Sequence, residues 1–189
     1  MNLITDRTEM DYKAALELSK IPWRKMNEGQ KAQWRGTMRG RYAAMDLNRV
    51  EEAVEALAMK MVEIPAEIDE EANAIGVDWD RGQLPYDPEE EINLTVKTDW
   101  TAADMMSFEE RERYMKNVAF FRDIFAPDAP LPFSLDYLTL EGANEIEAVL
   151  LAADNALESL REEILKGIHA EGEMLKFHSG EIYSNEVRV

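Results

Sequence analysis

The fold class is decided by residues 46–61, which read DLNRVEEAVEALAMKM. Apolar side chains recur in this stretch at alternating spacings of three and four residues, at Leu47, Val50, Val54, Leu57 and Met61. That spacing places them on one face of an α-helix. We therefore expect a helix that begins near Asp46 and buries this face. Pro65 should break or kink it, and a short acidic helix should resume over 66–75.

Other segments carry helix signals of the same kind. Ser107 followed by Glu110 forms a capping box, in which each residue satisfies a backbone N–H of the other. Thr5 or Thr8 suits the start of the first helix, and Asn27 suits the start of the second. We expect these helices over 8–19, from Asn27 to near Gly36, from Ser107 to about Phe125, and from about Glu141 to 170.

Two short segments show the pattern of β-structure. Residues 92–96 alternate apolar and polar side chains, which predicts a short half-buried strand. Met174–Phe177 and Glu181–Tyr183 flank a Ser-Gly turn signal, which predicts a C-terminal β-hairpin. The predicted fold is mainly α, with amphipathic helices in small helical units joined by irregular linkers. The segments are an N-terminal helical unit at 1–75, an acidic linker and short strand at 76–101, a C-terminal helical unit at 102–170, and a terminal hairpin or tail at 171–189.

Charge is the strongest clue to partners. The chain of 189 residues has 39 acidic and 21 basic side chains and a formal charge of −18. Such an excess opposes binding to nucleic acid or to an anionic membrane surface. Residues 20–41 are locally basic and 63–91 are acidic, so we expect the basic segment to pair with its own acidic segment or with that of a neighbouring subunit. Binding of single-stranded nucleic acid is the disfavoured alternative.

No residue pattern for catalysis or metal binding is present. The chain has no cysteine, which excludes disulfides and thiolate metal sites. The only histidines, His169 and His178, are isolated, and Asp78-x-Asp80-x-Gly82 places glycine where a calcium loop needs a ligand. We expect no enzyme activity, catalytic residue, metal or cofactor, no secretory signal and no membrane span. The remaining enzyme hypothesis is a helical carboxylate site that contains Glu147, Asp154, Glu158 and Glu162.

Aromatic residues in the irregular segments are the candidate partner anchors, because tryptophan is favoured at the centres of interfaces. The alternative is that they only hold loops onto the core. The candidate partner-binding residues are Trp23, Trp34, Trp79, Trp100, Arg35, Arg39, Ile182 and Tyr183. The edges of the strand and of the hairpin are further candidates, because an exposed edge can add to another chain's sheet.

Two predicted helices begin with the same short pattern. Asn48 and Glu51 are separated as Asn144 and Glu147 are, with a β-branched residue between them in each case. The pattern indicates either a repeated helical unit or a chance likeness between amphipathic helices. Because both asparagines lie near helix starts, we expect them to cap the helix or to bind the preceding loop.

Five stretches, in order along the chain, resemble a family of small structural proteins encoded by phages and prophages of Gram-positive, especially gut, bacteria. The genes of that family usually lie among tail, baseplate and tail-fibre genes. The stretches that carry the resemblance are Asp6-Arg7-Thr8, Asp46-Leu47-Asn48-Arg49-Val50-Glu51, Lys97-Thr98-Asp99-Trp100-Thr101, Gly142-Ala143-Asn144-Glu145-Ile146-Glu147 and Ser179-Gly180-Glu181-Ile182-Tyr183-Ser184.

The resemblance implies a virion structural protein of the tail, at the baseplate or the tail-fibre attachment region. It would be assembled in the host cytoplasm and act as an adaptor, with other tail, baseplate or fibre proteins and copies of itself as partners. It implies no catalytic residues. The alternative hypothesis, from the acidity, is a non-virion protein that captures a basic host protein during infection.

Overall fold

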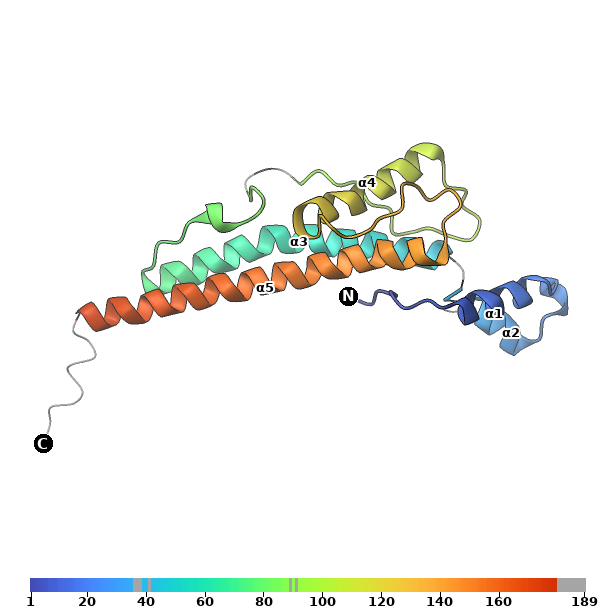
Figure 1. Cartoon of the computed structure of the whole chain (residues 1–189), viewed down its shortest axis with the longest axis horizontal. Helices are drawn as coiled ribbons and strands as arrows, with labels where there is room; N and C mark the ends of the chain where they lie inside the picture. The colour runs from blue at the N-terminus through green and yellow to red at the C-terminus, as the bar shows by residue number, and fades with distance from the viewer. Residues whose placement is uncertain (36–38, 41, 89, 91, 180–189) are drawn as a thin grey trace, which may run out of the picture. The chain divides into compact units, whose positions relative to one another are not determined.

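The computed structural model describes residues 1–35, 39–40, 42–88, 90 and 92–179. Its α-helices are α1 (Glu9–Ser19), α2 (Glu28–Arg35), α3 (Ala44–Ile75), α4 (Phe108–Phe125) and α5 (Leu140–Ser179), with short 3₁₀ helices at Trp23–Lys25 and Arg81–Gln83. Figure 1 shows the helices in order along the chain. The described residues contain no strand, so the protein is mainly helical, as the periodicity predicts.

The helices begin where side chains satisfy their first N–H groups. Thr8 and Asp11 form a capping box at α1, and Ser107 and Glu110 form the predicted one at α4. Asn27 exchanges side-chain hydrogen bonds with Gln30 at the start of α2. These local signals are readable in the sequence, and the corresponding predictions are confirmed.

The chain divides into two compact units that interleave along the sequence. Unit 1 comprises Met1–Leu57 and Asn93–Ala153, and unit 2 comprises Ala58–Ile92 and Asp154–Val189. Both α3 and α5 therefore contribute to each unit. The four-segment division expected from the sequence stays a prediction.

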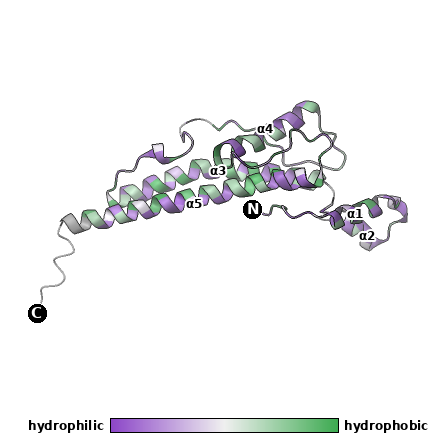
Figure 2. Ribbon diagram, viewed as in Figure 1, coloured by the Kyte–Doolittle hydropathy of each residue, from purple (hydrophilic) through white to green (hydrophobic). Residues whose placement is uncertain are grey.

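The core of unit 1 consists of the predicted apolar stripes. Its buried side chains are Val50, Val54 and Leu57 of α3, Tyr114, Val118 and Phe121 of α4, and Ile146, Leu150 and Ala153 of α5. Figure 2 shows hydrophobic and hydrophilic residues alternating along these helices, as expected when one face is buried. In the same unit α1 and α2 lie side by side. Gly40 approaches α1 so closely that a Cβ atom there would lie 2.0 Å from the Asp11 carbonyl oxygen.

In unit 2, α3 continues through Pro65, so the predicted break and restarted helix are not observed. Proline has no N–H, and the carbonyl of Met61 loses its helical partner. The hydroxyl of Tyr86 donates to that carbonyl at 3.1 Å and replaces the missing bond. Burial raises the pKa of Tyr86 to about 12, which keeps the hydroxyl protonated as a donor.

The strand predicted at 92–96 is not observed. Side chains of α4, rather than another strand, bind the one backbone carbonyl of this segment whose contacts are resolved. The carbonyl of Thr95 accepts hydrogen bonds from Arg113 Nη1, at 2.5 Å, and from Asn117 Nδ2, at 2.9 Å, both on α4. The alternation of its side chains reflects packing against a helix.

The first arm of the predicted hairpin is also wrong, because Met174–Phe177 belongs to α5. The helix runs beyond residue 170 in unit 2, where Gly172 lies close to Ile75 of α3. A Cβ atom at Gly172 would lie 2.9 Å from Ile75 Cδ1. The second arm, Glu181–Tyr183, lies outside the described residues.

Candidate functional site: a buried ion network and two asparagine clamps

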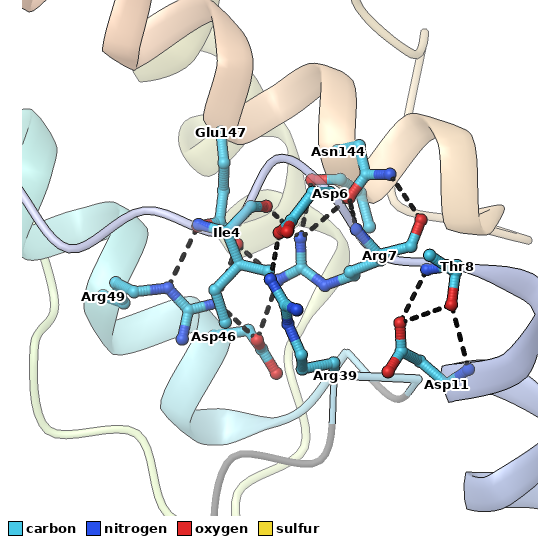
Figure 3. A network of polar contacts seen from close by, with 11 residues as sticks. Ile4, Asp6, Arg7, Thr8, Asp11, Arg39, Asp46, Arg49, Asn144 and Glu147 are labelled. Atoms are coloured by element: carbon cyan, nitrogen blue, oxygen red, sulfur yellow. Dashed lines mark hydrogen bonds and ion pairs between the residues drawn. The ribbon is translucent and has the colours of Figure 1, made fainter.

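Four charged side chains from three parts of unit 1 form a buried network (Figure 3). Arg7 comes from the extended segment before α1, Asp46 and Arg49 from the first turns of α3, and Glu147 from α5. Their side chains are 1%, 9%, 13% and 0% exposed, respectively. Two positive and two negative groups are present, so the network is neutral as a whole. A buried charge is tolerated when it is paired in this way.

Each carboxylate of the network contacts both arginines. Arg49 lies against Glu147, with Nε 3.0 Å from Oε2 and Nη2 2.7 Å from Oε1. Its Nη2 is also 2.5 Å from Asp46 Oδ1. Arg7 Nη2 pairs with Glu147 and lies 3.0 Å from Asp46 Oδ1. Burial lowers the pKa of Arg49, but the hydrogen bonds to Glu147 and Asp46 outweigh it and raise that pKa above its ordinary value.

The network also fixes the backbone of the N-terminal segment. Glu147 Oε2 accepts from the Ile4 N–H, and Arg7 Nη1 donates to the Ala143 carbonyl at 3.3 Å. Asn144 binds the Arg7 backbone twice: its Oδ1 accepts from the Arg7 N–H at 3.0 Å, and its Nδ2 donates to the Arg7 carbonyl at 3.0 Å. We call this pair of bonds the α5 clamp. It holds an extended segment on a helix without a neighbouring strand.

An equivalent clamp lies on α3. Asn48 Oδ1 accepts from the Trp100 N–H at 2.7 Å, and Asn48 Nδ2 donates to the Trp100 carbonyl at 3.0 Å. Three residues after each asparagine comes a buried glutamate, Glu51 or Glu147. Glu51 pairs with Arg113 of α4, with Oε1 2.5 Å from Nη2. The shared Asn-x-(Val/Ile)-Glu pattern therefore recurs in the same structural setting. Neither asparagine binds the loop that precedes its helix, although this was expected: Asn48 binds Trp100, 52 residues away, and Asn144 binds Arg7, 137 residues away.

The clamped segments are themselves a repeat. Residues 5–11 read TDRTEMD and residues 98–104 read TDWTAAD, so both follow T-D-x-T-x-x-D. In each, the second threonine and the last aspartate exchange hydrogen bonds or close a turn, as in Thr8 N–Asp11 Oδ2 at 2.8 Å and Thr101 N–Asp104 Oδ2 at 2.6 Å. The middle residue, Arg7 or Trp100, is the clamped one. The duplicated motif was the sequence signal for this site, and analysis of the helices alone missed it.

The pairing of motifs and clamps is reciprocal. The first motif is held by the asparagine of the second repeat, and the second motif by the asparagine of the first. Unit 1 thus contains two similar halves, each of which closes on the other. The halves differ at the clamped residue: Arg7 brings a charge to the network, whereas Trp100 is an apolar ring, 4% exposed, with Lys97 Nζ 3.8 Å from its centroid.

A cleft of about 600 Å³ lies beside the first motif. Arg7, Tyr12 and Arg39 line one side of it, and the segment that leads into α5 lines another. The remaining apolar wall consists of Leu47, Met106, Leu135, Leu138, Leu140 and Ala143. Arg39 pairs with Asp6 there, so this arginine has a partner within unit 1. The cleft is mixed in character, with an apolar wall and guanidinium groups at its sides.

The tryptophans predicted to anchor partners lie in different environments. Trp23 is 41% exposed, with Lys31 Nζ 5.8 Å from its centroid, and Trp34 is half-buried. Trp79 is half-buried in unit 2, where its Nε1 donates to Asp69 at 2.8 Å. Trp100 is buried in the α3 clamp, so a partner reaches its ring only if unit 1 opens.

The other predicted partner residues are less fully described. Arg35 ends α2, and its side chain lies outside the described residues, as do Ile182 and Tyr183. Three cations of the basic segment pair within unit 1: Lys20 with Glu17, Lys31 with Glu28 and Arg39 with Asp6.

Three of the four carboxylates considered for acid–base chemistry pair with cations. Glu147 pairs with Arg7 and Arg49 in the buried network. Asp154 and Glu158, in unit 2, both bind Lys60 Nζ, at 2.6 and 2.5 Å. Burial lowers the pKa of Lys60, and these two bonds raise it more, so the ammonium stays charged. In the segment Asp78-x-Asp80-x-Gly82, Asp80 Oδ1 accepts from the Gly82 N–H at 2.8 Å and closes a local turn.

Within the described ranges, no group of three or more His, Asp or Glu side chains is arranged to hold a metal ion. Among the helices described, none has a stretch apolar and long enough to cross a membrane. No family model matches the chain, and neither a curated protein nor a solved structure matches it.

Proposed function

We propose that this protein is a structural component of a phage tail, at the baseplate or the tail-fibre attachment region, where it acts as an adaptor for other tail proteins. One observation carries the proposal. Four of the five stretches that resemble the phage family supply the network and both clamps, through Arg7, Asn48, Trp100, Asn144 and Glu147. The resemblance therefore rests on residues with a joint structural task rather than on scattered likenesses.

The task suits an adaptor. A protein that joins neighbours in an assembly has to hold its surfaces in a fixed geometry. The clamps tie an N-terminal segment and an internal loop to two helices, and the network adds directional bonds that a purely apolar contact lacks. The charge of −18 favours neighbours with basic surfaces over nucleic acid or lipid.

The test is to purify particles of a phage that encodes this chain and to identify their proteins by mass spectrometry. We expect the protein in intact particles and in isolated tails, cross-linked to baseplate or fibre proteins. Tails from a phage that lacks the gene should be incomplete at that position. Restoring the wild-type gene should repair them.

Absence of the protein from particles, together with its presence in the infected cell, would refute the proposal. It would favour an acidic non-virion protein that captures a basic host protein. The observation behind that alternative is the set of exposed acids in unit 2, which includes Glu63, Glu70 and Asp78. Affinity purification from infected cells would then recover a basic host protein in a stoichiometric complex.

A further inference from the structure

Four large apolar side chains of unit 1 are exposed near the start of α4 and in the segment before α5. Met105 is 93% exposed, Phe108 56%, Phe133 102% and Tyr137 100%. Arg111 joins the two segments that carry them: its Nη1 donates to the Met106 carbonyl at 3.1 Å, and its Nε lies 3.4 Å from Asp136 Oδ1. We call these four side chains the aromatic rim.

The backbone at Tyr137 is strained. Its φ is +57°, and it is the only residue other than glycine with a positive φ among the described residues. A bulky side chain is disfavoured in this left-handed region. The ring is fully exposed, so burial within the chain does not offset the strain. Strain of this kind is typical of residues held in place for binding.

The aromatic rim borders the cleft beside the first motif. Leu135 and Leu138 line the cleft, while Tyr137, between them, points to solvent. The cleft offers an apolar wall together with the guanidinium groups of Arg39 and Arg111. Aromatic rings bind well to such a surface, because they pack on aliphatic side chains and stack on guanidinium planes. A volume of about 600 Å³ admits a phenyl and a phenol ring.

We propose that this face is the contact between two copies of the chain, in a two-fold arrangement in which the aromatic rim of each copy enters the cleft of the other. A two-fold contact requires one face to carry both the projecting groups and the cavity that receives them, and this face does. The inference rests on the proposed function, since it specifies how the adaptor would meet its own copies.

Area and charge agree with a second copy as the occupant. Exposed aromatic and methionine side chains of this number cover on the order of 500 Å² per copy, so a pair buries about 1,000 Å², the lower limit for a specific interface. Two chains of charge −18 repel each other, but this face carries both signs, with Arg39 and Arg111 against Glu9 and Asp136. Copies therefore meet here with less repulsion than elsewhere.

The test measures the mass of the full chain by sedimentation equilibrium. Protein concentrations from about 1 to about 100 µM suit a contact near the lower size limit of specific interfaces. The variant Phe133→Ser with Tyr137→Gly removes both rings, and glycine accepts the positive φ, so the fold is retained. The matched control is Met59→Ser with Val62→Ser, which removes two apolar side chains exposed at 56% and 60% in unit 2.

We expect a wild-type dimer, at least a tenfold weaker dimer for the rim variant, and an unchanged dimer for the control. Tyr12→Glu, which places a charge on the cleft side, should also weaken it. A monomeric wild type, or a dimer lost in the control and kept in the rim variant, overturns the inference. If the protein is found in tails but is monomeric in solution, the proposed function stands and the two-fold contact fails.

Discussion

Replacing Glu147 by glutamine tests whether the buried network holds unit 1 together. The side chain is 0% exposed and contacts Arg7 and Arg49, whose side chains are 1% and 13% exposed. Glutamine keeps the size but removes the charge, which leaves two arginines against Asp46 alone. Breaking a buried ion pair by removing one partner costs about 3–5 kcal/mol, because a charge is left buried without compensation. For a chain of this length that lowers Tm by about 6–20 °C.

The assay is chemical and thermal unfolding followed by circular dichroism, with Glu67→Gln as the matched control. Glu67 pairs with Arg161 in unit 2, and both side chains are partly exposed, at 48% and 30%. Such a pair contributes about 0–1 kcal/mol. In about 1 M salt, where the screening length is about 3 Å, the control's effect should vanish and that of Glu147→Gln should persist.

A double variant separates the charge from the shape. Arg7→Met together with Glu147→Met leaves Arg49 and Asp46 as a neutral pair. We expect the double variant to be more stable than the sum of the single losses predicts, with a coupling of about 1–3 kcal/mol. The reasoning is refuted if Glu147→Gln destabilises the protein no more than Glu67→Gln does, or if its effect disappears in high salt.

Three further changes address the clamp, the proline and the surface carboxylates. Asn144→Ala removes both bonds of the α5 clamp and should cost about 2–4 kcal/mol in urea unfolding, because two partly buried backbone groups lose their partners; a loss below about 0.5 kcal/mol would contradict the clamp. Tyr86→Phe should cost about 1 kcal/mol in wild type and less beside Pro65→Ala, since alanine restores the N–H that the Met61 carbonyl lacks; equal losses in both backgrounds would argue against that role. Hydrogen bonds to Arg161 and Arg81 lower the pKa of Glu67 and of Asp69, respectively, below their ordinary values of 4.5 and 3.8. Because the pKa values of these carboxyls are lower in the folded protein than in the unfolded chain, the two ion pairs stabilise the fold fully at a pH above the unfolded pKa values. This stabilisation is lost as the pH falls through the folded pKa values. The Tm difference between wild type and Glu67→Gln with Asp69→Asn should therefore be present at neutral pH and shrink in strong acid, and a pH-independent difference would rule this out.

Local signals predicted the helices because local interactions form them. The capping box of Ser107 and Glu110 and the three-four spacing of Val50, Val54 and Leu57 each lie within a few residues. The same local view failed where the partner is distant. Pro65 lies within α3, and the Met61 carbonyl that it leaves without a helical partner accepts from Tyr86, twenty-five positions after Met61. Residues 92–96 form no strand, and the Thr95 carbonyl accepts instead from Arg113 and Asn117 of α4.

The sequence indicated the two asparagines of the candidate site but not the segments that they bind. The repeated Asn-x-(Val/Ile)-Glu pattern indicated that Asn48 and Asn144 cap their helices or bind the preceding loops, whereas each binds a segment distant in sequence, at Trp100 and Arg7. The duplicated T-D-x-T-x-x-D motif marks the two segments that the asparagines bind. Neither pattern indicates which motif each asparagine binds. The side-chain amide of Asn48 or of Asn144 could form the same two hydrogen bonds with either motif.

The amino-acid sequence by itself determined the helical class, the buried stripes, the helix starts and the two repeated motifs. Tertiary structure alone decided that the repeats bind each other reciprocally and that Arg7, Asp46, Arg49 and Glu147 converge. It also decided that Tyr137 projects beside a cleft. The physical reason is separation along the chain: Arg7 and Glu147 are 140 residues apart. A charge is placed next to its partner only when the apolar faces of α3, α4 and α5 have packed and brought both into a site that excludes water.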